Sequence, residues 1–343
     1  MTGYERIVNA LGGNPVDKVP VMLHNFMMAA REAGYSMKDY RDSPRAIADS
    51  FINAVEKYKY DGVLVEIDTT IIAGACGVPV DFPEDEPARC PRGLIRGLEE
   101  VAGLPDVRVE NYRYIQIILE AVRLLKDHFR DDIFIRGNCD QAPFTLSALI
   151  RGTQDFLTDL ILADKDSIIR LLEYATSACL QFIRLMAQTG ADMVSNGDSI
   201  AGPDVVPPEI YSEFAFPYEM KLVEEAHRLQ LPYTLHICGD TTLILDQMVE
   251  TGADAFELDY KTDVKNVTRA FKNGATLIGN IDPSGVIANG TVHEVRGKTN
   301  QLLEHMAGTN RFILNAGCAI PSNTPEDNIF ALVQAARDFK PLH

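Results

Sequence analysis

The sequence predicts a (β/α)₈ (TIM) barrel of the α/β class. Eight short β-rich runs alternate with amphipathic stretches from end to end, and this alternation is typical of a parallel barrel. A doubly wound open sheet is the alternative, but no predicted strand is followed by G-x-G-x-x-G and no G-x-x-x-x-G-K-S/T motif is present. The predicted strands are 19–24, 62–68, 133–137, 192–196, 232–237, 253–258, 275–280 and 311–315.

Helical signals lie between these runs. Ser43 and Pro44 are typical of an N-cap followed by the first position of a helix. Apolar residues recur at three- and four-residue spacing over 115–129 and 166–190, which predicts amphipathic helices. Thr324 and the acids that follow it predict the capped start of the last helix. We also expect an N-terminal helical extension before the first strand.

The domain organisation follows from length and local composition. The chain has 343 residues, within the range of a barrel with insertions, so we expect one catalytic domain over 1–343. Segment 70–111 is rich in Pro, Gly and acids and follows the second predicted strand. We interpret it as an insertion over the barrel mouth.

Charge and cysteine usage exclude several classes of function. The net charge of −17 argues against nucleic-acid or anionic-membrane binding. The N-terminus has no apolar signal core, and no run approaches the length of a membrane span. The six cysteines are scattered, without a disulfide-like framework. We therefore expect a cytoplasmic protein with reduced thiols.

Polar side chains gather at the ends of the predicted strands, where a barrel builds its active site. In chain order they are His24 and Asn25, Glu66 and Asp68, Asn138 and Asp140, Asn196 and Asp198, His236 and Cys238, Glu257 and Asp259, Asn280 and Asp282, and Asn315 and Cys318. Any single Asp or Asn among them is also explained as the cap of a following helix. The set as a whole favours a catalytic mouth.

One nitrogen and two sulfurs of this set suggest a metal site. His236 and Cys238 are two residues apart on a strand, so their side chains point to the same side. Cys318 follows the eighth strand and faces the same mouth. One imidazole and two thiolates suit zinc, and three protein ligands leave the open position of a catalytic site. Asp259 or Glu257 is a candidate fourth ligand in the absence of substrate.

With these residues placed, the chain resembles the uroporphyrinogen decarboxylase superfamily, and within it the zinc-dependent corrinoid methyltransferase branch. The resemblance spans nearly the whole length, from ERIVNALGGNPVDKVPV through GNCDQAPFTL to LHICGDTTLILDQM and AGCAIPSNTPEDN. It implies zinc ligation by His236, Cys238 and Cys318. It also implies a methyl partner in the cobalamin of a separate corrinoid protein, since this chain has no D-x-H-x-x-G signature.

The branch includes methylcobalamin:coenzyme M methyltransferases and demethylases, which leaves the direction of transfer open. Because the strand ends are acidic and amide-rich, we expect demethylation of a small donor such as a methoxylated aromatic, with methyl transfer to a thiol like coenzyme M as the alternative. A decarboxylase is weaker, because the stretch HNFMMAAREAGY at the first strand end has Arg31 as its only arginine, and the acids would repel a polycarboxylate. A non-catalytic module that binds a corrinoid protein is the fourth possibility.

Individual roles are assigned to the remaining strand-end residues. The predicted catalytic residues are His24, Asp68, Asp140 and Asp198, and the predicted substrate-binding residues are Asn25, Met27, Asn196 and Asp282.

Overall fold

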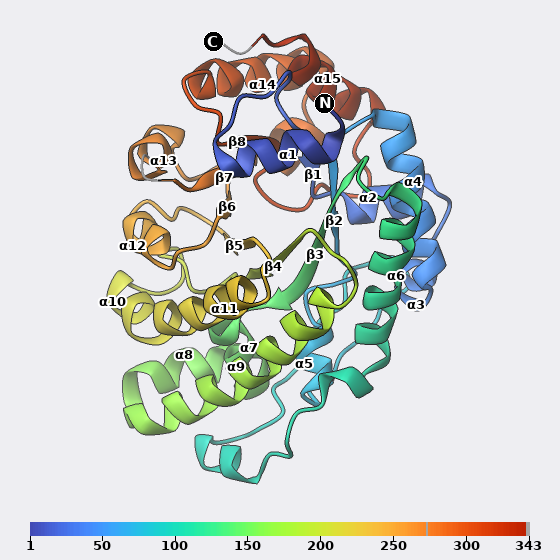
Figure 1. Ribbon diagram of the computed structural model, residues 1–343. Coiled ribbons are helices and arrows are strands. Elements are labelled where there is room, and N and C mark those ends of the chain that lie inside the picture. The colour runs from blue at the N-terminus through green and yellow to red at the C-terminus, as the bar shows by residue number, and fades with distance from the viewer. Residues whose placement is uncertain (272–273, 341–343) are drawn as a thin grey trace.

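The computed structural model, which describes residues 1–271 and 274–340, is a barrel of eight parallel strands surrounded by helices (Figure 1). The strands pair in chain order, and a bridge between Val21 and Leu314 brings the first strand against the last. All eight strand predictions and the barrel are confirmed. The strands are β1 Met22–Leu23, β2 Gly62–Val65, β3 Phe134–Gln141, β4 Met193–Gly197, β5 Tyr233–Ile237, β6 Ala255–Leu258, β7 Thr276–Ile281 and β8 Phe312–Ala316.

Helices cover the outside of the barrel and both of its ends. The α-helices are α1 Gly3–Gly12, α2 Phe26–Glu32, α3 Met37–Asp42, α4 Pro44–Tyr58, α5 Ile71–Ala75, α6 Arg113–Phe129, α7 Pro143–Arg151, α8 Thr153–Leu162, α9 Lys165–Ala187, α10 Pro208–Ile210, α11 Phe216–Arg228, α12 Leu245–Glu250, α13 Val264–Ala270, α14 Val292–Met306 and α15 Glu326–Asp338. Shorter helical turns are η1 Leu98–Gly103, η2 Val109–Asn111, η3 Tyr211–Ala215 and η5 Pro283–Ala288. Within the described residues, no helix combines the length and the apolar character that a bilayer crossing requires.

Of the two helix starts that the sequence predicts, one is confirmed and the other is not. The Ser43 hydroxyl accepts a hydrogen bond from the Ala46 amide, and Pro44 opens α4 as predicted. The predicted Thr324 cap is wrong, because the N-cap position of α15 is Pro325, which has no side-chain acceptor. The last helix therefore relies on the acids of its first turn, which favour the positive end of the helix dipole.

The N-terminal helix α1 closes the lower end of the barrel, the end at which the strands begin. This confirms the predicted extension. Its buried residues Ile7 and Ala10 pack against side chains from the barrel interior. These interior residues are Met22, Phe134, Met193, Ala255, Ile278 and Ile313. The lower barrel is thus an apolar core, as in other barrels of this class.

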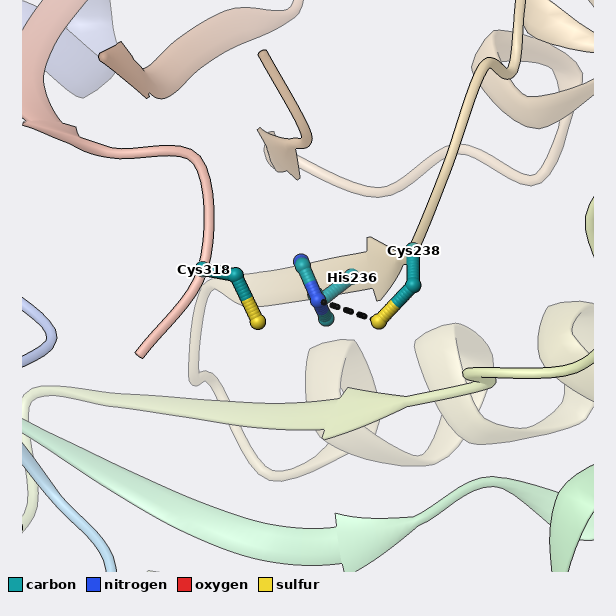
Figure 2. Close-up of side chains that lie close together, drawn as sticks. All are labelled: His236, Cys238 and Cys318. Carbon is teal, nitrogen blue, oxygen red and sulfur yellow. Dashed lines mark hydrogen bonds between the residues drawn. The ribbon is translucent and has the colours of Figure 1, made fainter. Parts of the chain in front are cut away.

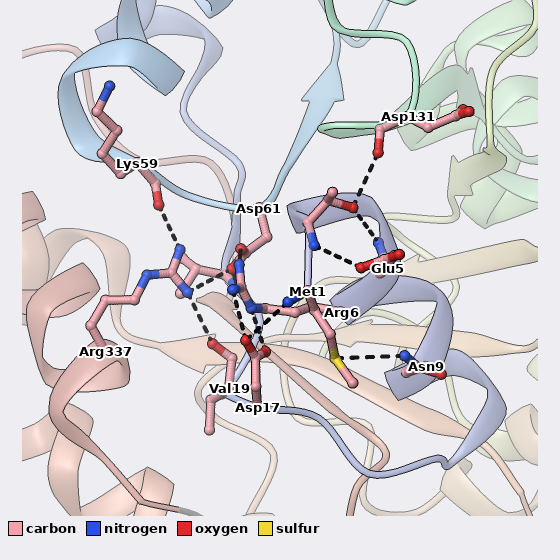
Figure 3. A network of polar contacts seen from close by, with 12 residues as sticks. Met1, Glu5, Arg6, Asn9, Asp17, Val19, Lys59, Asp61, Asp131 and Arg337 are labelled. Carbon is pink, nitrogen blue, oxygen red and sulfur yellow. Dashed lines mark hydrogen bonds and ion pairs between the residues drawn. The ribbon is translucent and has the colours of Figure 1, made fainter.

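A buried carboxylate joins the two ends of the chain to this lower face (Figure 3). Asp61 accepts hydrogen bonds from Arg6 of α1 at 2.9 Å, from Arg337 of α15 at 2.8 Å and from the Val21 amide at 2.8 Å. Because Asp61 is only 1% exposed, these partners compensate the cost of burying its charge. The network is structural and lies at the end of the barrel opposite the catalytic one.

The barrel interior changes from apolar to polar within two residues along several strands. Alternate residues of a strand face the same side, so the positions two beyond Met22, Phe134 and Ala255 also point inward. Those positions are His24, Arg136 and Glu257. The period of the strand therefore places a charged layer directly above the apolar core, at the carboxyl end of the barrel.

Candidate metal centre and substrate cavity

His236, Cys238 and Cys318 meet at the carboxyl end of the barrel (Figure 2). His236 lies in β5, Cys238 directly follows that strand, and Cys318 follows β8. The ligating atoms of the three side chains lie within 4.8 Å of one another, and Nε2 of His236 is 3.2 Å from Sγ of Cys238. An imidazole and two thiols at this spacing form a donor set that suits zinc.

The main chain of β6 sets the orientation of the histidine ring. Nδ1 of His236 is 2.8 Å from the carbonyl oxygen of Glu257, which can only accept a hydrogen bond. Nδ1 therefore carries a proton, and Nε2, which lies on the side of the two sulfurs, is the ring nitrogen available to a metal. A hydrogen bond of this kind to the outer ring nitrogen is the usual support of a metal-bound histidine.

A glycine beside each cysteine allows the loops to approach closely. A Cβ on Gly317 would lie 2.5 Å from the Tyr260 amide nitrogen, so a side chain there would displace the loop that holds Cys318. Gly239 has a φ of +86°, which a residue with a side chain rarely adopts. Both cysteines are therefore positioned by backbone geometry that only glycine permits.

The two thiols differ in acidity. A hydrogen bond from Cys318 and the charge of His236, acting against burial, together lower the pKa of Cys238 to about 4. The same hydrogen bond raises the pKa of Cys318 to about 12. A thiolate is thus already present beside the imidazole, as the chemistry of metal ligation requires.

Both candidate fourth ligands have other partners. Asp259 accepts hydrogen bonds from the amides of Gly239 and Lys261, at 3.0 and 3.1 Å. The carboxylate of Glu257 contacts two cationic side chains. Among residues 1–271 and 274–340, neither acid belongs to the group whose ligating atoms converge. In this conformation the site has three protein ligands.

The three metal-ligand side chains line a cavity of about 280 Å³, which is at the small end for ligand pockets. Of the predicted catalytic and substrate-binding residues, five also line it. These are His24, Met27, Asp68, Asp140 and Asn196. The cavity therefore joins the metal site to residues from most of the strand ends.

Two cations and two carboxylates alternate in one wall of this cavity. The His24 ring lies between Glu66 and Glu257, with an oxygen of each 2.8 Å from one ring nitrogen. Burial lowers the pKa of His24, but the two carboxylates raise it more, to about 10, so the ring is cationic at neutral pH. Arg136 contacts the other oxygen of Glu257. The negative charges of Glu66 and Glu257 are therefore balanced by the positive charges of His24 and Arg136.

Arg136 was missed from the sequence because only the last polar residues of each strand were considered. It lies two residues before Asn138 on β3, so the period of the strand places it on the same inward face. A lone arginine inside a strand is also the signal of a buried ion pair, because an unpaired one is rarely buried.

Two predicted catalytic acids hold the insertion 70–111. Asp140 accepts a hydrogen bond from the Ile72 amide at 2.7 Å, and Asp68 accepts one from the Ala88 amide at 2.7 Å. The second oxygen of Asp140 is buried without a hydrogen-bond partner. Burial raises the pKa of Asp140 well above its usual range, and the nearby carboxylates of Glu66 and Asp68 raise it further, which favours the protonated form that can donate a hydrogen bond.

Three predicted site residues lie outside the cavity lining. Asp198 is fully buried and accepts hydrogen bonds from the amide and hydroxyl of Thr145 at the start of α7. Asp282 accepts from two amides as the cap of η5, and Asn25 is buried against the Tyr60 hydroxyl. Asp282 therefore performs the capping role that the sequence also allowed, whereas Asp198 caps α7, which precedes it in the chain.

Comparison with known proteins identifies the family of the chain. A profile of the uroporphyrinogen decarboxylase (URO-D) family matches residues 2–339. The chain belongs to this family. Methylcobamide:CoM methyltransferase MtbA of Methanosarcina acetivorans is 28% identical, over 99% of this chain and 100% of its own length. Methylcobamide:CoM methyltransferase MtaA of Methanosarcina barkeri is 26% identical, over 97% of this chain and 96% of its own.

A solved structure has the same fold. A methyltransferase from Methanosarcina mazei superposes with a TM-score of 0.90 at 23% identity, covering 98% of this chain and 99% of its own. The predicted superfamily and the predicted enzyme class, a methyltransferase, are confirmed by these relatives.

Proposed function

We propose that this protein transfers a methyl group between the cobalamin of a separate corrinoid protein and the sulfur of a small thiol, with zinc held by His236, Cys238 and Cys318. The converging donor set carries this proposal. A zinc ion in that set would lower the pKa of a coordinated thiol, so that a thiolate nucleophile is available at neutral pH.

The direction from corrinoid to thiol is favoured over demethylation of a methoxylated aromatic. The relatives do not support the aromatic donor that the sequence suggested, since the two described above are named as coenzyme M methyltransferases. The charge of the cavity does not oppose an anionic thiol, because Glu66, Glu257 and Asp68 are each paired with a cation. The acidic strand ends that argued against such a substrate are thus compensated.

The lining residues have distinct roles in this scheme. Asp140 donates a hydrogen bond from its free oxygen to the bound substrate, and His24 compensates the charges of Glu66 and Glu257, so that they do not repel an anionic thiol. Met27 gives an apolar contact to the short carbon chain of the thiol, while Asn196 is held by Tyr233 at 3.0 Å and keeps its wall in place. Because Asp198 lies behind the wall, it positions α7 and does not contact substrate.

The rival functions have less support from the cavity. A decarboxylase of a polycarboxylate needs free cations, but His24 and Arg136 are already paired with carboxylates. A non-catalytic module that docks on a corrinoid protein needs no metal donor set open to an enclosed cavity.

A methyl-transfer screen tests the function. Purified protein loaded with zinc is mixed with methylcobalamin and 2-mercaptoethanesulfonate, and the cobalamin spectrum is followed. In parallel, reduced cobalamin is offered with methoxyaromatics. We expect demethylation of methylcobalamin that depends on the thiol and is lost in Cys318→Ser, with Cys90→Ser as the matched cysteine control. Turnover with methoxyaromatics and not with the thiol would instead support methyl transfer from an aromatic donor to cobalamin.

A further inference from the structure

Segment 81–89 of the insertion forms a turn against the barrel mouth. Two main-chain hydrogen bonds between Asp81 and Arg89, of 2.9 and 3.1 Å, close this turn at its base. The side chains of the turn are mostly exposed, and Ala88 is the buried one. A turn with so little buried apolar surface depends on polar contacts to keep its position.

A buried ion pair supplies those contacts. Arg41 of α3 donates from Nε to Asp68 at 2.6 Å, and both side chains are only 1% exposed. Its two other nitrogens donate to the carbonyl oxygens of Pro83 and Glu86, at 2.7 and 2.9 Å. The planar fork of the guanidinium makes these bonds together, and a lysine would not reproduce that geometry.

The acid of the pair holds the same turn from the other side. Asp68 follows β2, and its second oxygen accepts the hydrogen bond from the Ala88 amide. The contacts at Glu86 and Ala88 therefore flank Pro87, which lines the substrate cavity together with Asp68. Other contacts lie toward the start of the turn, where the Lys38 amide donates to the carbonyl oxygen of Glu84 and the Phe82 ring packs on Tyr114 and on the Arg41 guanidinium.

We propose that Arg41 and Asp68 are positioning residues that hold segment 81–89 as a wall of the cavity and thereby limit the size of the thiol it accepts. Only the identity of the substrate rests on the proposed function. The position of the wall follows from the three hydrogen bonds that Arg41 and Asp68 make to residues 83–88. Asp68, predicted above to act in catalysis, has both oxygens engaged in this structural role.

Hydrogen exchange tests the position of the wall without an activity assay. In Arg41→Met and Asp68→Asn, we expect amides of segment 81–89 to exchange at least tenfold faster than in the wild type, at unchanged zinc content. Arg89→Met is the matched control, because its pair with Asp81 lies in the same turn at 3.8 Å and is exposed on both sides. Exchange that stays at the wild-type rate in both variants would overturn the inference.

Kinetics test the consequence for substrate size. With methylcobalamin as donor, we expect the KM for 2-mercaptoethanesulfonate to rise about tenfold in both variants while kcat changes by less than about threefold. The bulkier thiol glutathione should gain activity relative to the small one. A fall in kcat at constant KM in Asp68→Asn would instead make Asp68 a catalytic residue and overturn its positioning role.

Two further comparisons distinguish a failure of the wall proposal from a variant that does not fold and from a failure of the proposed function. If Arg41→Met does not fold, Arg41→Lys keeps the charge and loses the fork, and it should show an intermediate rise in exchange. If the wild type methylates neither thiol, the proposed function fails, while the exchange measurement still decides whether the ion pair holds the wall.

Discussion

The carbonyl oxygen of Glu257 accepts a hydrogen bond from Nδ1 of His236, so the residue that orients the metal ligand also organises the charges of the cavity. The two residues are register partners on β6 and β5. The Glu257 main chain faces the ligand, while its carboxylate holds His24 and Arg136. The metal site and the charged wall are therefore one connected unit.

The metal ligands are the first prediction. We expect about one zinc ion per chain in the wild type and loss of stable binding in Cys238→Ser and Cys318→Ser, because a hydroxyl is a poor replacement for a thiolate ligand. Metal analysis after dialysis measures this, and Cys90→Ser should retain the metal. Full retention in either ligand variant, or a wild type without metal after zinc loading, would contradict the assignment.

The second prediction concerns Gly317, the glycine beside Cys318. Gly317→Ala should weaken zinc binding roughly tenfold or more, because its Cβ would push the ligand loop away from the Tyr260 main chain. Competition with a chromophoric chelator gives the affinity. Gly103→Ala is the control, since a Cβ there meets no atom within 4 Å. Equal affinities in the two variants would show that the loop adjusts without cost.

The third prediction concerns the buried ion pair between Arg136 and Glu257. Arg136→Met leaves Glu257 buried without one of its cations, and we expect a loss of about 3–5 kcal/mol in the free energy of unfolding. Urea denaturation measures it. Arg123→Met, which removes a partly exposed pair with Glu120, should cost less than about 1 kcal/mol. A small effect at both positions would mean that the buried network adds little stability.

The fourth prediction concerns the pH dependence of the free energy of unfolding. Asp198 and Glu219 are buried together near α7 and α11, and Tyr211 donates to Glu219 at 2.7 Å. Burial raises the pKa of Asp198 to about 6 and that of Glu219 well above its usual range. Because both folded-state pKa values are raised, the pair contributes stability at low pH that is lost as the pH rises through about 6.

Glu219→Gln removes one of the two titrations. The loss of unfolding free energy between about pH 5 and pH 8 should therefore be smaller than in the wild type. Urea denaturation at the two pH values measures the difference, and Glu173→Gln, at an exposed pair with Lys221, should leave it unchanged. An identical pH dependence in all three proteins would exclude the buried pair as its source.

The barrel and the metal triad were predictable because both follow from local rules. Alternating strands and helices indicate the fold, and two residues at spacing two on a strand must face the same side. Cys318 joined them because the ends of all parallel strands meet at one mouth. The same rule predicted that the acids of the other strand ends lie at the mouth, but it did not predict the role of each acid.

The sequence by itself determined the order of the elements, the convergence of His236, Cys238 and Cys318 at the barrel mouth, and the family. Only the tertiary structure decided which acids are free and which are paired. Arg136 is 121 positions from Glu257, and Arg41 is 27 positions from Asp68. Pairing over such separations depends on which side chains the closed barrel brings within a few ångströms in a low-dielectric interior, and no local pattern encodes that distance.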